Sequence, residues 1–139
     1  MQTFLPYESF TLSASVLDRP RLCKQRVENL QIMKVLTGHS HGWRNHPAVK
    51  MWSGCEATLM SYQTAICNEW TSRGYKDTCL DKTKLLFGNF STNLSPWWLG
   101  EEKLHSSHRS NLLRKNPEHY SQFNWTEPDN LEYFWPTKE

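Results

Sequence analysis

The stretch from Val16 to Leu36, VLDRPRLCKQRVENLQIMKVL, places a single carboxylate among basic residues. Glu28 follows Lys24 by four residues and Arg21 by seven, so in a helix these three side chains share one face. A carboxylate in such surroundings can stabilise positive charge on a reacting group and can move protons. The spacing of Lys24 and Glu28 is equally that of an ordinary surface ion pair, which is the commoner use of such a pair.

A helix would position these residues, and the sequence contains a start for it. Asp18 is a good N-cap, because its carboxylate can accept from free amides of the first turn. Pro20 falls inside that turn, where its missing N–H costs nothing. Helical spacing gives two stripes. The expected core stripe is Cys23, Val27, Leu30 and Lys34, widened by Leu22, Met33 and Leu36, and the expected polar stripe is Arg21, Lys24, Gln25, Glu28 and Gln31.

The composition fits one domain spanning residues 1–139, with 37% hydrophobic residues and neither a membrane span nor an apolar secretory segment. A net charge of +2 is mildly basic and only weakly favours nucleic acid as a partner. Seven Trp, six Phe and five Tyr could fill a core or stack on bases. The four cysteines are Cys23, Cys55, Cys67 and Cys79, and no two of them have CxxC spacing. This pattern predicts reduced thiols in an intracellular protein and no metal site.

Further elements can be expected on both sides of this helix. Residues 1–15 are too apolar for a free tail, so we expect an arm that packs into the body and brings the terminal amine near the core. A second helical region is expected from about Pro47 to Arg73, with Asn45 or His46 as its N-cap. Gly54 is a weak point that could split this region into two helices. Its core stripe is Trp52, Cys55, Leu59, Tyr62, Ile66 and Trp70, and Gly74 and Tyr75 follow its end.

The second half of the chain is less regular. The segment from Lys82 to Phe90 could be a short helix or extended. A third helix is expected to start near 95–101 and to stop at Pro117, with Leu104, His108, Leu112 and Leu113 as its core stripe. The aromatic tail is either a clasp over the core or a stacking surface. The expected fold is mainly α, a compact single domain of about three main helices with an N-terminal arm and an aromatic C-terminal segment.

Four stretches, in order, carry a family resemblance. LDRPRLCKQRVENL resembles the first helix of the pyrimidine-dimer DNA glycosylases, the bacteriophage endonuclease V-like family, and Glu28 falls on the position of that family's catalytic glutamate. GWRNHPAVKMW resembles the opening of the second helix in bacterial relatives, and EWTSRGY resembles its close. SHRSNLLRKNPEHYSQFNW resembles the C-terminal basic helix, its proline stop and the aromatic segment behind it.

The resemblance implies a helical DNA repair enzyme, a glycosylase and abasic-site lyase that acts on damaged double-stranded DNA. In this chemistry the N-terminal α-amine forms an imine at the sugar, the glutamate assists, and β-elimination cuts the strand. An α-amine is less basic than a lysine amine, so a larger share of it is neutral and nucleophilic near neutral pH. The resemblance further implies a monomer in the cytoplasm of a bacterial or virus-infected cell, with no cofactor and no metal.

The family pattern assigns roles to particular residues. Met1 would be the nucleophile, since the long side chain of Gln2 disfavours methionine removal, and Glu28 its catalytic partner. Basic and imidazole side chains would hold phosphates or a displaced base. The predicted DNA-binding residues are Arg21, Lys24, Arg26, His46, His108, Arg109 and Arg114.

The chain departs from the family pattern in two places. The lead-in to Asp18 is a few residues longer. The family's arginine before the glutamate is Val27 here, and Arg26 lies one position earlier, about 100° round the helix. His46 and His108 also have ordinary structural uses, as a cap and a core residue. Two alternatives therefore stay open: a non-catalytic DNA- or protein-binding module on this scaffold, or an enzyme of this fold for another modified base or nucleotide.

Overall fold

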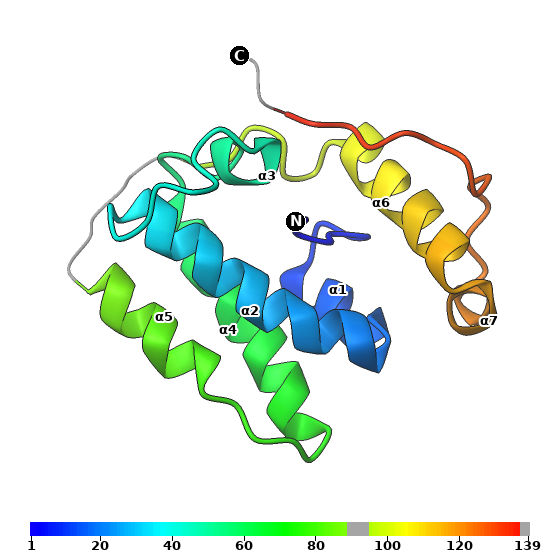
Figure 1. Cartoon of the computed structure of the whole chain (residues 1–139). Helices are drawn as coiled ribbons and strands as arrows, with labels where there is room; N and C mark the ends of the chain where they lie inside the picture. The colour runs from blue at the N-terminus through cyan, green and yellow to red at the C-terminus, as the bar shows by residue number, and fades with distance from the viewer. Residues whose placement is uncertain (89–94, 137–139) are drawn as a thin grey trace.

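The computed structural model describes residues 1–88 and 95–136 (Figure 1). Within these ranges the chain forms α-helices and one short 3₁₀ helix, and no strand. The mainly α fold is thus confirmed. The elements are α1 (Phe10–Val16), α2 (Arg19–Leu36), α3 (Pro47–Lys50), α4 (Glu56–Ser72), α5 (Cys79–Phe87), α6 (Glu102–Lys115), α7 (Pro117–Tyr120) and η1 (Ser121–Phe123).

Helix α2 has the predicted limits but not the predicted faces. Leu22, Leu30 and Met33 are buried, whereas Val27 is 40% exposed and Lys34 is exposed. The buried face of α2 also includes three residues that lie outside the predicted core stripe. The reason is that α2 packs against α4 and α5 on one side and against the N-terminal arm on the other. The residues whose burial was not predicted are Gln25, Asn29 and Ile32.

The start of α2 is fixed by the C-terminal part of the chain rather than by a cap. The prediction that the Asp18 carboxylate bonds the first-turn amides was wrong. It accepts instead from Tyr120 Oη at 2.6 Å, Asn116 Nδ2 at 3.1 Å and Arg21 at 2.7 Å. Burial raises the pKa of Asp18, but these partners outweigh it and lower the pKa below its usual value. Asp18 therefore ties α2 to α7.

The second helical region breaks at Gly54, where φ is 81°, giving α3 and α4. His46 caps α3, because its Nδ1 accepts from the amide of Ala48 at 3.0 Å. Beyond α4, Gly74 has φ 97°, and Tyr75 stacks on Trp70 with ring centroids 4.3 Å apart. The predicted core stripe of this region is buried throughout: Trp52, Cys55, Leu59, Tyr62, Ile66 and Trp70.

The remaining elements complete one shared core. The uncertain segment after Lys82 is helical as far as Phe87, and residues 89 and 90 lie outside the described part of the chain. Helix α6 ends at Lys115, and Pro117 begins α7 after an extended Asn116. The aromatic tail then runs back beside α6 (Figure 1), and its rings pack on the core, as a clasp would: Phe123, Trp125, Tyr133, Phe134 and Trp135.

The N-terminus lies near the middle of the molecule, between α2 and α6 (Figure 1). Residues 2–6 are buried, in agreement with the predicted packed arm. Helix α1, which the sequence analysis did not predict, follows the arm and is capped by the Ser9 hydroxyl. All four cysteines are free. Among the described helices, none combines the length and apolar character needed to cross a membrane.

Candidate active site

A buried glutamine of α2 makes two hydrogen bonds to the backbone of the N-terminal arm. Gln25 Oε1 accepts from the amide of Phe4 at 2.9 Å, and its Nε2 donates to the carbonyl of Gln2 at 2.8 Å. The same Nε2 donates to Asn29 at 2.9 Å, and Asn29 donates to Gln63 at 3.0 Å. A side-chain amide can both donate and accept, so Gln25 pairs with the arm much as a neighbouring strand would.

On its other side the arm is held by α6. His108 Nδ1 accepts from the amide of Leu5 at 2.9 Å, and His105 Nδ1 lies 2.7 Å from the carbonyl of Leu5. The amide of Gly100 donates to His105 Nε2 at 3.0 Å, so the His105 proton resides on Nδ1 and is donated to Leu5. Two histidines thus bind both polar groups of one arm residue.

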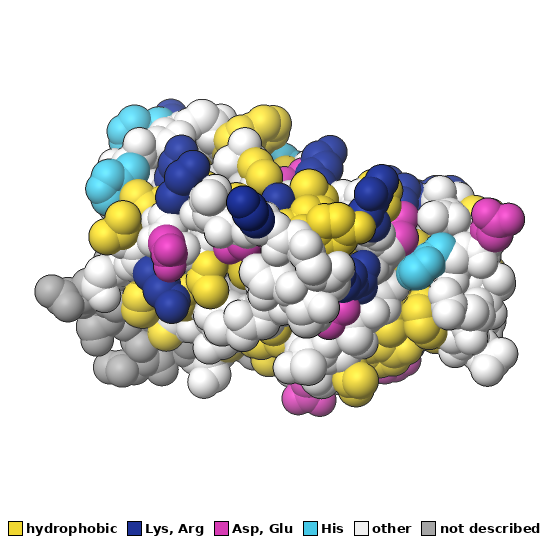
Figure 2. Space-filling view, turned by 90° about the horizontal axis from the view of Figure 1, so that it is seen from below, with side chains coloured by type: hydrophobic (Ala, Val, Ile, Leu, Met, Phe, Trp, Pro, Cys, Tyr) yellow, Lys and Arg dark blue, Asp and Glu magenta, His cyan; other side chains and the backbone are white. Residues whose placement is uncertain are grey.

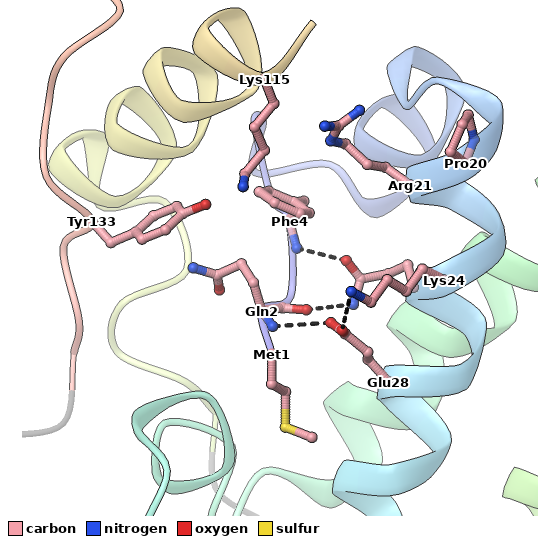
Figure 3. Close-up of a pocket in the computed structure, with 10 residues that line it drawn as sticks. Met1, Gln2, Phe4, Pro20, Arg21, Lys24, Glu28, Lys115 and Tyr133 are labelled. Carbon is pink, nitrogen blue, oxygen red and sulfur yellow. Dashed lines mark hydrogen bonds and ion pairs between the residues drawn. The ribbon is translucent and has the colours of Figure 1, made fainter.

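This anchored arm forms one wall of a pocket of about 390 Å³ (Figure 3). Glu28 Oε1 accepts from the backbone amide of Gln2 at 3.0 Å, and Glu28 Oε2 lies 3.7 Å from Lys24 Nζ. The Glu28 side chain is only 13% exposed. Met1 directly precedes Gln2 and also lines the pocket, so the first residue of the chain shares the pocket with this largely buried carboxylate. The pocket residues are Met1, Gln2, Phe4, Pro20, Arg21, Lys24, Gln25, Glu28, Lys115 and Tyr133.

Three basic side chains line this pocket, namely Arg21, Lys24 and Lys115. Burial lowers the pKa of Lys115, and the positive charges of Arg21, Arg114 and Lys24 lower it further. Figure 2 shows one face of the molecule, seen from below, where basic side chains are spread with acidic ones between them. The group at the pocket is therefore a local concentration of positive charge in a chain of small net charge, and it suits a phosphate backbone.

His46 is not among the residues that line the pocket, but the charges of the site influence it. Burial and the positive charge of the N-terminal amine lower the pKa of His46, while the charge of Glu28 raises it. Both groups thus lie within electrostatic reach of the imidazole. The ring packs edge-on against Trp43 and Trp135, with centroids 5.6 and 5.9 Å away. Its capping bond to α3 is the structural use that the sequence analysis left open.

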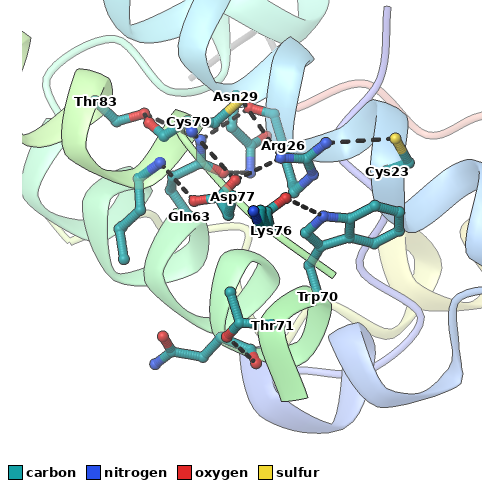
Figure 4. Close-up of polar contacts among 12 residues, drawn as sticks. Cys23, Arg26, Asn29, Gln63, Trp70, Thr71, Lys76, Asp77, Cys79 and Thr83 are labelled. Atoms are coloured by element: carbon teal, nitrogen blue, oxygen red, sulfur yellow. Dashed lines mark hydrogen bonds and ion pairs between the residues drawn. The ribbon is translucent and has the colours of Figure 1, made fainter. Parts of the chain in front are cut away.

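Arg26 is placed away from the pocket (Figure 4). Its guanidinium lies 2.5 Å from the carboxylate of Asp77 and 4.6 Å from the ring centre of Trp70. Cys23 Sγ accepts from the same guanidinium at 3.4 Å. The Arg26 side chain is 11% exposed, so its contacts join α2 to the segment before α5.

The predicted DNA contacts on α6 are likewise engaged within the protein. His108 is fully buried among Leu5, Phe4 and Tyr133. Arg109 donates to the carbonyl of Pro6 at 2.7 Å and also binds Glu102 and Glu127. Arg114 donates to Asn111. None of these three residues lines the pocket.

Six residues that line the pocket were not predicted as site residues from the sequence: Gln2, Phe4, Pro20, Gln25, Lys115 and Tyr133. Two signals were present in the sequence. Lys115 directly follows Arg114 in the basic last turn of its helix, and Gln25 lies one turn before Glu28. In the described ranges, no group of three or more His, Cys, Asp or Glu residues is arranged to hold a metal ion.

The described residues thus form a mainly α fold whose N-terminal arm lies beside a largely buried carboxylate and three cations. A family model described as pyrimidine dimer DNA glycosylase matches residues 1–83, more than half of the chain, so the chain belongs to this family. The protein is accordingly a DNA repair glycosylase, and its substrate is DNA. Neither a curated protein nor a solved structure matches the chain.

Proposed function

We propose that the protein excises ultraviolet-induced pyrimidine dimers from duplex DNA with its N-terminal amine and then cuts the strand as an abasic-site lyase. The observation that supports this most directly is the hydrogen bond from the Gln2 amide to Glu28, which brings the first residue of the chain to a buried carboxylate. An amine used as a nucleophile requires this kind of fixed position next to a proton-transfer group.

The chemistry follows from these two groups. The neutral Met1 amine attacks the sugar C1′, the glycosidic bond breaks with its electron pair on the base, and the amine proton passes to the base. Glu28 stabilises the positive charge that develops on the sugar and carries the proton. The sugar ring opens to an imine. Removal of a C2′ proton then breaks the C3′–O bond, which cuts the strand.

The cations at the pocket have a separate task. Arg21, Lys24 and Lys115 would neutralise phosphates on either side of the lesion. Extruding a nucleotide costs a few kcal/mol and costs least where pairing is already damaged. Phosphate contacts at the pocket rim would therefore favour damaged sites without reading their sequence.

Borohydride trapping tests the proposal. Ultraviolet-irradiated, abasic and untreated duplexes are incubated with the protein and borohydride, which reduces an imine to a stable protein–DNA adduct. We expect adducts on both damaged duplexes and none on the untreated one. Protein acetylated at Met1 should bind DNA but form no adduct, whereas the same chain with a short C-terminal extension should behave as wild type. An adduct from the acetylated protein would contradict the role of the amine.

The exposure of Val27 directly before Glu28 favours one rival, a non-catalytic DNA-binding module on the same scaffold. Damage-dependent binding with no adduct on either damaged duplex would support that rival. An adduct on the abasic duplex alone would support the lyase activity. It would also mean that the enzyme releases a modified base other than a pyrimidine dimer. A panel of duplexes carrying different modified bases would then identify the substrate.

A further inference from the structure

The side chain of Gln2 carries a hydrogen-bond donor that the protein itself leaves unused. Gln2 is 6% exposed, and its Oε1 accepts from the amide of Thr3 at 2.8 Å. Only the oxygen of the amide can accept, so this bond fixes which way the group points. The Nε2 group is then buried with no hydrogen-bond partner anywhere in the described ranges of the chain. A buried polar group without a partner is unfavourable, which points to a partner that is absent from the free protein.

The unused donor faces the pocket. Figure 3 shows the Gln2 side chain extending away from Glu28, on the side of the pocket where Tyr133 lies. The pocket thus has two polar parts that differ in character. Glu28 and Lys24 form a charged part, while the Gln2 amide lies on the side of the rings of Phe4 and Tyr133, where Lys115 also reaches in (Figure 3).

We propose that Gln2 Nε2 donates a hydrogen bond to a carbonyl oxygen of the pyrimidine that the enzyme releases, an inference that rests on the proposed function. A neutral amide matches a neutral carbonyl, whereas phosphates are better matched by the three cations of the pocket. Aromatic rings beside the donor offer stacking contacts to a base. The donor therefore lies where a base, rather than a phosphate, is recognised.

The covalent link between Met1 and Gln2 strengthens this assignment. During attack the amine must reach C1′ of the sugar, and a carbonyl group of a pyrimidine is attached to the ring nitrogen that C1′ carries. A donor one residue away from the amine is therefore near that oxygen. As the glycosidic electrons move onto the base, the oxygen gains negative charge and the hydrogen bond strengthens. Gln2 transfers no proton in this step, so the proton still passes from the amine to the base.

An abasic duplex separates this role from simple positioning of the amine, because it has the sugar but no base. Gln2→Glu removes the donor and keeps the acceptor for Thr3, and Gln2→Met removes both without adding charge. Both residues are long, so Met1 should be retained, which intact mass verifies. Gln31→Glu is the matched control, since Gln31 is exposed on α2 and outside the pocket.

We expect both Gln2 variants to lose about tenfold or more in single-turnover release of a defined pyrimidine dimer. Borohydride trapping on the abasic duplex should change by less than about threefold, and Gln31→Glu should match wild type on both substrates. Equal losses on the two substrates would overturn the inference and make Gln2 a positioning or phosphate-binding residue. Unchanged dimer release would overturn it as well. Failure of the wild type to trap on the abasic duplex would instead contradict the proposed function.

Discussion

The backbone amide of Gln2 donates a hydrogen bond of 3.0 Å to the Glu28 carboxylate, joining the second residue of the chain to the middle of helix α2. Further along the arm, Gln25 accepts from the Phe4 amide and His108 from the Leu5 amide, so α2 and α6 hold the arm from opposite sides. The start of the chain, normally its most mobile part, is therefore a fixed part of the core. Its position depends on contacts made by residues from both halves of the chain.

Glu28→Gln separates the chemistry of the carboxylate from its structural role. The amide oxygen can still accept from Gln2, so we expect the fold and DNA affinity to be retained within a few-fold. The uncharged group cannot act in proton transfer, so single-turnover base release should fall by about 100-fold or more. Glu69→Gln, which alters a surface ion pair with Arg73, serves as the control. Retained turnover in the Glu28 variant would remove Glu28 from the mechanism.

The structure divides the basic residues into those that line the pocket and those that pair with carboxylates within the protein. Lys24→Met and Lys115→Met should each reduce the salt dependence of DNA binding by about one phosphate contact. Arg26→Met should leave that dependence unchanged and lower the free energy of unfolding by about 3 kcal/mol, because it leaves Asp77 buried without its partner. Anisotropy titrations at several salt concentrations and urea unfolding measure the two effects. A lower salt dependence in Arg26→Met would show that Arg26 contacts DNA after all.

Gln25→Leu tests whether the arm depends on its clamp. The change leaves the Phe4 amide and the Gln2 carbonyl without partners, and we expect a loss of about 2–4 kcal/mol in the free energy of unfolding. Trapping on abasic duplex should slow as the amine loses its fixed position. Gln31→Leu, the same change on the exposed side of α2, should stay within about 0.5 kcal/mol of wild type. Equal stability of the two variants would mean that the arm is held without Gln25.

His108 should make the protein sensitive to acid. Burial, with a further contribution from His105, lowers the pKa of His108 from its ordinary value of 6.5 to about 3. Between these pH values the unfolded chain binds a proton that the folded protein does not, so the free energy of unfolding falls as the pH is lowered. The contribution reaches at most about 1.4 kcal/mol per pH unit.

His108→Asn keeps an acceptor near the position of Nδ1 but does not titrate. Urea unfolding of both proteins from pH 7 to pH 4 should give a smaller slope for the variant. Carboxylates that titrate in the same range, such as Asp18, are common to both proteins and cancel in the comparison. Parallel slopes would contradict this prediction, because they would mean that His108 takes up its proton equally in the folded and the unfolded protein over this pH range.

The elements with strong local signals were predictable from the sequence. The limits of α2, the break at Gly54 and the buried stripe of α4 follow from capping residues and helical periodicity. The family resemblance located Glu28, and the apolar character of residues 1–15 predicted a packed arm. In each case the information lies within one turn of helix or one short segment.

The partners of the polar residues were not predictable in the same way. Arg26 and Arg109 are cations at positions that suit DNA, but Asp77 and Glu127, distant in sequence, bind them inside the protein. Gln25 has the helical phase of a surface residue, and only the arm crossing α2 explains its burial. Tertiary contacts over such separations leave no trace in local spacing, so the chemistry of these side chains could be predicted from the sequence but their partners could not.

Identifying the attacking amine is the most direct test of the proposed mechanism. The pocket contains three amines, those of Met1, Lys24 and Lys115. The borohydride-reduced adduct on abasic duplex can be digested and its site of attachment mapped by mass spectrometry. We expect the sugar remnant on the α-nitrogen of Met1. A remnant on Lys24 or Lys115 would contradict the mechanism.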